Sequence, residues 1–89
     1  MDWGVHLPHL GRDVGRDSLI NFAQTAESLG MHSAWVSDHV CWPAVFDSKY
    51  PYSSDGSFPA PVGLGWLDPI GTLMFVAACT EKLRLGFTV

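Results

Sequence analysis

The fold is decided by the stretch SLINFAQTAESLGMHSAWVSDH, residues 18–39. Its first part places apolar residues on one half of a helical wheel and polar residues on the other, which predicts an amphipathic helix over 18–29. Gly30 stands where a helix commonly ends in a left-handed glycine. Residues 33–37 then predict a strand, because the segment is short and carries tryptophan and valine.

The alternation of strands and helices continues on both sides of this stretch. Residues 3–7 predict a first strand. Asp68 is followed by a proline, which predicts an N-cap and the start of a second helix over 70–80. Residues 83–89 predict a third strand. The order is therefore β-α-β-α-β, and strands that a helix connects in this way run parallel.

This order leads to a prediction of fold class. The helix over 70–80 is apolar nearly all round, which indicates burial on more than one side. A free three-stranded parallel sheet would leave a bare face, whereas parallel sheets occur almost only with both faces covered. A TIM (β/α)8 barrel has about 250 residues, so a chain of 89 corresponds to about three of its eight units. We therefore predict an α/β fold, with residues 1–89 as the first three strands and two helices of an incomplete TIM barrel.

The composition excludes several classes of protein. Hydrophobic residues make up 47% of the chain and charged residues 16%, against about 25% charged in a typical domain. This balance argues against disorder, and the net charge of -4 argues against a nucleic-acid partner. No apolar run approaches the ~20 residues of a membrane helix, and no Cys-x-x-Cys pair or signal peptide is present. We expect a cytoplasmic protein that acts on a small molecule, without nucleic acid or membrane.

The segment over 40–66 has no periodicity and carries six aromatic residues among its prolines. Loops of this length are usually functional or disordered, and the aromatic content favours a packed active-site loop. In a barrel, chemistry lies at the carboxyl ends of the strands. The residues at those ends are Pro8, His9, Asp38, His39, Thr88 and Val89. Because the loop leaves from the same end as Asp38 and His39, that pair is the leading candidate site.

The sequence WVSDHV at 35–40 resembles the luciferase-like monooxygenase superfamily, whose members are flavin- and deazaflavin-dependent (β/α)8 oxidoreductases. Further segments fit the same family in the same order: GVHLP at 4–8, AESLG at 26–30, YPYSSDGSFP at 50–59, WLDP at 66–69 and AACTEKLRLG at 77–86. The segment at 50–59 resembles a loop common among members that use coenzyme F-420. The resemblance covers nearly the whole chain but only the first third of a family member, so it implies an N-terminal fragment.

The resemblance implies an activity, a coenzyme and a role for each matched residue. The reaction is monooxygenation with O2 or hydride transfer with coenzyme F-420, an 8-hydroxy-5-deazaflavin, with FMN as the alternative. His39 is the catalytic acid/base, because a histidine gains or loses a proton near neutral pH. Asp38 hydrogen-bonds the coenzyme, and Thr88 and Val89 lie where relatives support its ring. The substrate and lid residues are Pro8, Trp42, Tyr50 and Tyr52. Full-length relatives are implied to be homodimers, and we expect the isolated chain to be inactive.

Two alternatives stay open. His6, His9, Asp38 and His39 could belong to a fragment of a TIM-barrel metal-dependent hydrolase. Positions three apart in a strand face opposite sides, however, and metal sites need three or four convergent ligands, so we predict no metal site. The chain could instead be a non-catalytic interaction fragment whose apolar helix over 70–80 docks on a partner. In that case Asp38 would cap a turn and His39 would serve only in packing.

Overall fold

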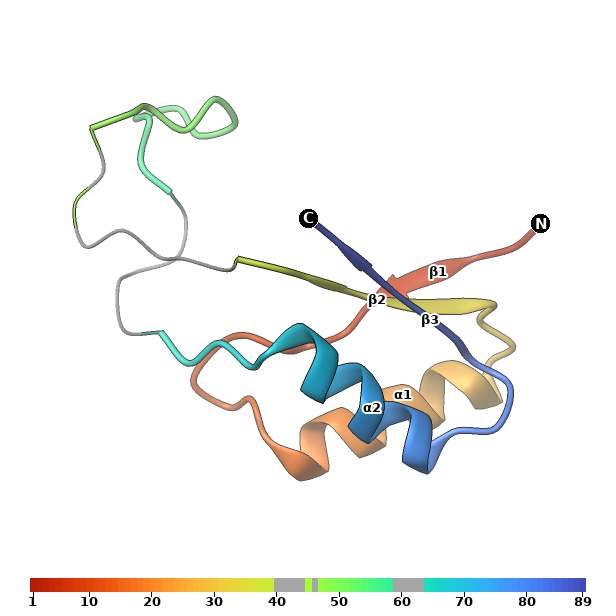
Figure 1. Ribbon diagram of the computed structural model, residues 1–89. Coiled ribbons are helices and arrows are strands. Elements are labelled where there is room, and N and C mark those ends of the chain that lie inside the picture. Colours follow the sequence, from red (N-terminus) through yellow and green to blue (C-terminus); the bar gives the residue numbers. More distant parts are fainter. Residues whose placement is uncertain (40–44, 46, 59–63) are drawn as a thin grey trace.

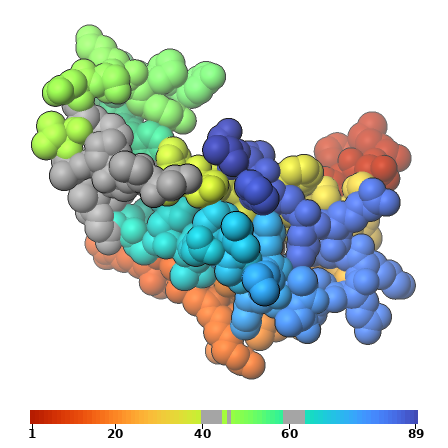
Figure 2. Space-filling view, viewed as in Figure 1, coloured from red at the N-terminus to blue at the C-terminus, as the bar shows by residue number. Residues whose placement is uncertain are grey.

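The computed structural model describes residues 1–39, 45, 47–58 and 64–89 (Figure 1). The elements follow in the order β1 (Gly4–His6), α1 (Arg16–Ser28), β2 (Ser33–Ser37), α2 (Pro69–Cys79) and β3 (Arg84–Thr88). Each lies within two residues of its predicted start. The segment over 47–58 stands clear of the two helices in the space-filling view (Figure 2).

The strands form one parallel sheet in the order β1-β2-β3. Val5 pairs with Ala34, and Trp35 pairs with Gly86. Both helices lie on the same face of this sheet (Figure 1). The core forms between the sheet and the helices. Along the strands, its small and branched residues alternate with residues that lie on the face away from the helices. Its buried members are Leu7, Ala23, Ala34, Val36, Val76 and Leu83.

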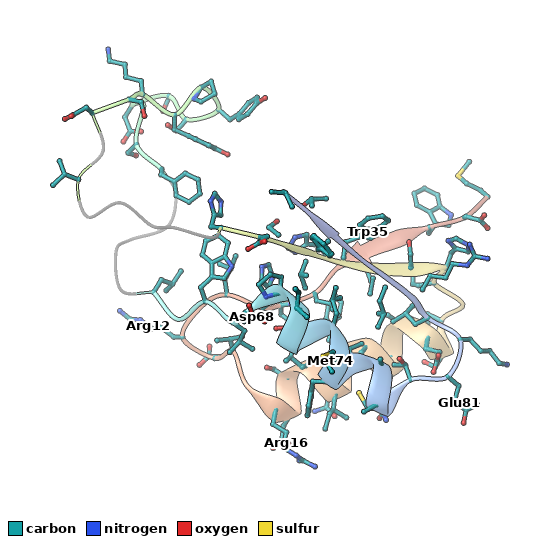
Figure 3. All side chains as sticks on the ribbon, viewed as in Figure 1. Arg12, Arg16, Trp35, Asp68, Met74 and Glu81 are labelled. Atoms are coloured by element: carbon teal, nitrogen blue, oxygen red, sulfur yellow. The ribbon has the colours of Figure 1, made fainter. Side chains whose placement is uncertain are left out.

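The prediction of a barrel fragment is wrong. Within the residues described, the sheet is open, with β1 and β3 at its edges and no strand that joins them. A barrel requires strands that close on themselves with a fixed tilt and stagger. The chain instead forms two layers, in which the helices cover one face and the side chain of Trp35 lies on the other, 40% exposed (Figure 3).

The prediction that α2 is buried on several sides is also wrong. The helix buries Pro69, Thr72 and Val76. Ile70 and Met74 are 58% and 70% exposed, because α1 and the sheet pack against the other side of α2. Figure 3 shows the side chain of Met74 on this helix. Among the helices of the described residues, neither is long and apolar enough to span a bilayer.

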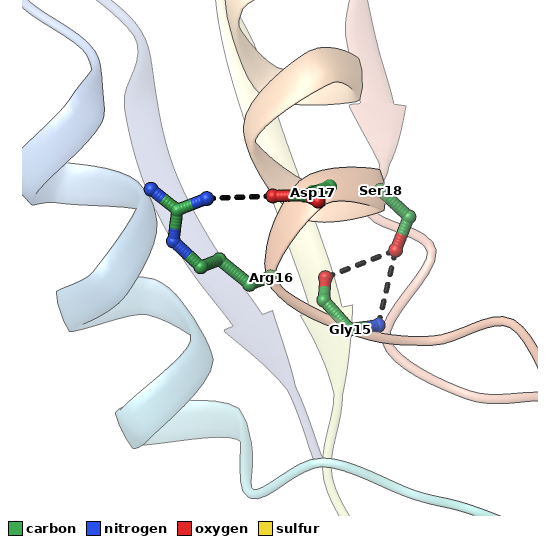
Figure 4. A network of polar contacts seen from close by, with 4 residues as sticks. All are labelled: Gly15, Arg16, Asp17 and Ser18. Carbon is green, nitrogen blue, oxygen red and sulfur yellow. Dashed lines mark hydrogen bonds and ion pairs between the residues drawn. The ribbon is translucent and has the colours of Figure 1, made fainter.

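The start of α1 differs from the sequence prediction, and Ser18 explains the difference. Gly15 is the N-cap residue, and the hydroxyl of Ser18 in the first turn accepts from its N–H and donates to its carbonyl, both at 3.0 Å (Figure 4). The serine therefore supports the helix from its third position, and the helix begins two residues before the predicted start. Arg16 and Asp17 form an exposed ion pair there, a kind of contact that contributes little to stability. Gly30 ends the helix as predicted, at φ 76°.

Two carboxylates fix the ends of α2. Asp68 accepts a hydrogen bond from the N–H of Gly71 at 2.6 Å, which confirms it as the N-cap. At the other end, Glu27 of α1 accepts from the backbone N–H groups of residues 81, 82 and 83. These hydrogen bonds hold the pKa of Glu27 below its ordinary value of 4.5, and the bond from the N–H of Lys82 has the largest effect. The turn between α2 and β3 is thereby attached to α1.

Candidate functional site

The carboxyl ends of β1 and β2 bring polar and aromatic side chains together, because parallel strands end at the same edge of a sheet. We call this group the strand-end cluster. It consists of His6, His9, Ser37, Asp38, His39 and Trp66. The sequence predicted Asp38 and His39 as site residues, whereas the contributions of Ser37 and Trp66 were missed.

His9 is fully buried and continues the ladder where β1 ends. The last regular bond runs from the N–H of Leu7 to the carbonyl of Trp35 at 2.8 Å. The imidazole then stands between the two strands: Nδ1 lies 3.1 Å from the carbonyl oxygen of Leu7, and Nε2 lies 3.3 Å from the N and 3.0 Å from the O of Ser37. Pro8 ends the strand, and the imidazole of His9 takes the place of the next backbone hydrogen bond between β1 and β2.

His6 and Ser37 meet on the sheet face opposite the helices. Nε2 of His6 lies 3.0 Å from Oγ of Ser37, and its Nδ1 lies 3.1 Å from the carbonyl oxygen of Leu7. The ring of His6 is 5.0 Å from that of His9. The two rings lie close together although positions three apart in a strand face opposite sides, because Pro8 ends the strand and His9 no longer follows its alternation.

Trp66 is held in the cluster by a short antiparallel contact. Leu10 and Trp66 form a β-bridge, the N–H of Gly11 donates to Gly65, and that of Leu67 donates to His9, both at 2.9 Å. The indole therefore stands edge-on to two imidazoles, 5.7 Å from His9 and 4.9 Å from His39. The sequence showed Trp66 only as one of several aromatic residues of a long loop.

His39 is exposed at the end of β2 and connects the cluster to that loop. Its ring lies 5.7 Å from Phe58, which in turn lies 4.9 Å from Tyr50. Tyr52 contacts Tyr50 at 5.6 Å and is almost fully exposed. A row of aromatic rings thus extends outward from His39. This row contains two of the predicted lid residues.

A cavity of about 360 Å³ lies between the end of β2 and the start of α2. It is lined by Asp38, His39, Trp66, Leu67, Asp68, Pro69 and Ile70. A second cavity, of about 390 Å³, lies between the amino ends of α1 and α2, and no histidine lines it. We assign the candidate site to the first cavity, because His39 and the carboxylates of Asp38 and Asp68 all line it.

The remaining predicted site residues lie at varied distances from this cavity. The carbonyl of Thr88 accepts from the N–H of Asp38 at 2.9 Å, so β3 ends beside the site. Val89 follows it, almost fully exposed. Pro8 is half-buried between β1 and His9. Trp42 lies outside the residues that the structure describes.

A metal ion would need several donor side chains that converge on one point. Within the described parts of the chain, no three His, Cys, Asp or Glu side chains gather as they would around a metal ion. The nitrogens of His6 and His9 face the backbone of residues 7 and 37 and the hydroxyl of Ser37.

Comparisons with known proteins found relatives by sequence similarity. The chain is 33% identical over 70 residues to "Uncharacterized protein Rv0940c" of Mycobacterium tuberculosis (strain ATCC 25618 / H37Rv) and to "Uncharacterized protein Mb0965c" of Mycobacterium bovis. The match covers 79% of this chain and 24% of each relative, so the chain spans about a quarter of their length. No family model matches. No solved structure matches either, which is the second finding against the predicted barrel.

Proposed function

We propose that this chain carries the acid/base part of the site of a luciferase-like, flavin- or deazaflavin-dependent oxidoreductase. The observation that carries the proposal is the position of His39, whose exposed imidazole follows Asp38 and lines a cavity beside two aromatic rings. A general acid or base needs such a place, within reach of a ligand and shielded on its other sides. The resemblance of residues 35–40 to that superfamily supports the same function.

The residues present fit a planar ring system. A cavity of about 360 Å³ lies at the lower end of the range for ligand sites, which is about 300–1,000 Å³. When bound, coenzyme F-420 would supply or accept a hydride, and FMN would supply a reduced flavin for O2. His39 would donate or accept the proton that accompanies the reaction. Asp38 would accept a hydrogen bond from the ligand, and Trp66 would exclude water.

The phosphate-bearing part of such a coenzyme finds little support in this chain. Its arginines are Arg12, Arg16 and Arg84. Arg16 pairs with Asp17, and Arg84 begins β3 at the end opposite the cavity. We therefore propose that the chain binds the ring portion and does not turn over alone.

The test is a titration of the 89-residue protein with coenzyme F-420 and, separately, with FMN, followed by fluorescence. We expect saturable binding of one of them, weakened at least about tenfold by His39→Ala or Asp38→Asn, which corresponds to about 1.4 kcal/mol. His32→Ala is the matched control, because that imidazole lies near Asp2 at the amino end of the sheet. Absence of saturable binding of either coenzyme, or equal binding by His39→Ala, would refute the proposal.

The exposed face of α2 favours a second candidate, a role in association. Ile70 and Met74 lie one helical turn apart and are both largely exposed. The partner that the family resemblance implies is a second copy of the chain. Sedimentation velocity should then show a dimer that Met74→Lys converts to a monomer, and a parent chain that is monomeric at high concentration would exclude this role.

A further inference from the structure

Ser37 and His6 form a hydrogen-bonded pair that the proposed oxidoreductase site does not use. They come from neighbouring strands, β2 and β1, and Oγ of Ser37 lies 3.0 Å from Nε2 of His6. His6 is exposed and Ser37 half-buried, so a small molecule can reach the pair from the face opposite the helices. Neither Asp38 nor His39 makes this contact.

The hydrogen bonds of His6 determine which of its nitrogens can act as a base. Nδ1 lies 3.1 Å from the carbonyl oxygen of Leu7, and a carbonyl only accepts, so this contact favours the tautomer in which Nδ1 carries the hydrogen. In that tautomer Nε2 has the lone pair and accepts from the hydroxyl of Ser37. A nucleophile, a base within hydrogen-bond distance and a third group that orients the base make up the arrangement that activates serine in covalent catalysis.

The backbone of Ser37 is itself held in place. The imidazole of His9 lies at hydrogen-bond distance from both its N and its O. On the other side of β2, the following N–H, that of Asp38, donates to the carbonyl of Thr88 at 2.9 Å. The hydroxyl thus projects from a strand that is fixed on both edges, which keeps it aligned with His6.

Trp35 adds an aromatic surface to the same face, beside His6 in the register of β1 against β2, with its indole turned toward Ser33, Gly4 and Gly86. Trp35 precedes Ser37 by two residues, so both side chains project from the same face of β2. The indole donates from Nε1 to the hydroxyl of Ser33 at 2.9 Å. Its six-membered ring covers Gly86, because a Cβ atom added to this glycine would stand only 2.5 Å from the ring. The neighbouring strand carries Gly4, where an added Cβ would stand 3.1 Å from Nε1. The ring therefore lies flat across the sheet and offers a planar apolar surface.

We propose that Ser37 is a nucleophile that accepts acyl groups from activated aryl esters, with His6 as its general base. Oγ of Ser37 forms a bond to the carbonyl carbon of the ester while its proton passes to Nε2 of His6. The bond from that carbon to the aryl oxygen breaks, and the aryl oxide leaves with its electron pair. The proton on His6 then passes to solvent. The products are an O-acyl serine and one aryl oxide, whose ring would leave across the face that carries the indole of Trp35.

The test uses 4-nitrophenyl acetate with the complete chain. Release of 4-nitrophenolate is followed by absorbance, and the acetylated residue is located by peptide mass spectrometry. We expect one acetyl group on Ser37 and a burst of one equivalent of nitrophenolate, both lost in Ser37→Ala. His6→Gln should slow labelling about 100-fold, the lower end of the effect of a general base. Ser28→Ala is the matched control, because that hydroxyl donates to a carbonyl and has no base beside it.

Two further measurements keep the proposal open to refutation if a variant folds poorly. Circular dichroism and thermal unfolding report whether each variant is folded, and His6→Asn serves in place of His6→Gln. Acetylation of lysine or the amino terminus in place of Ser37, or an equal rate of labelling in a folded His6 variant, would overturn the proposal.

Discussion

The buried ring of His9 provides the sharpest test of the structure. His9→Phe keeps an aromatic ring of similar shape in the same space and removes both nitrogens. The variant therefore separates the hydrogen bonds of the imidazole from its packing against Trp66. If the imidazole completes the ladder between residues 7 and 37, the variant must lose stability although its apolar volume is retained.

The expected loss follows from the groups that His9 contacts. The N–H of Ser37 loses the nitrogen it faces at 3.3 Å, and leaving a buried donor unsatisfied costs about 1–3 kcal/mol. The bond from Nδ1 to Leu7 contributes about 0.5–1.5 kcal/mol. The carbonyl of Leu7 keeps the N–H of residue 9 as a donor at 2.9 Å, so no further penalty arises there. The sum is about 1.5–4.5 kcal/mol in the free energy of unfolding.

Urea and thermal unfolding of the parent and His9→Phe measure this quantity directly. A domain of this size changes its Tm by about 4–8 °C for each kcal/mol, so we expect a decrease of at least about 6 °C. His32→Phe is the control, because that ring is partly exposed and lies at the opposite end of β2 from residue 37, and it should change stability by less than about 0.5 kcal/mol. A loss in His9→Phe no larger than that of the control would refute the bridging role.

Three other substitutions test the fold. Glu27→Gln should lower the urea midpoint at neutral pH. The lowered pKa of Glu27 makes its stabilising contribution present above about pH 4.5 and lost as the pH falls through the folded value, so the difference from the parent should vanish in acid. Gly86→Ala should cost about 1–3 kcal/mol by urea unfolding, since the new Cβ would collide with Trp35, whereas Gly15→Ala, with nothing within 4 Å, should cost less. Asp68→Ala should cost about 1 kcal/mol in thermal unfolding, through loss of the N-cap, and no change in Tm would contradict that role.

The elements were predictable because their signals are local. The apolar period of α1, the Asp-Pro start of α2 and the short apolar strand β2 each depend on neighbours within a few residues. The barrel prediction failed because it depended on what covers the faces of the sheet. An apolar helix such as α2 indicates a need for burial, but it does not specify how many layers meet it, and here Met74 remains exposed.

The site was predictable only in part for the same reason. Asp38 and His39 were found because they directly follow a recognisable strand. The pair of His6 and Ser37 was missed, since the two residues are 31 positions apart and meet only through the register of β1 against β2. Trp66 was missed as a site residue because its place depends on an isolated bridge to Leu10.

The sequence by itself determined where strands and helices form and that the strands run parallel, because turn residues, caps and hydrophobic periods act over short distances along the chain. The tertiary structure alone decided that the sheet stays open in the described residues, that one imidazole replaces a rung of the ladder, and that another meets a serine hydroxyl. These features depend on contacts between residues that are far apart in the chain. The distances between such residues are fixed only when the strands pair in register and the helices pack on one face of the sheet.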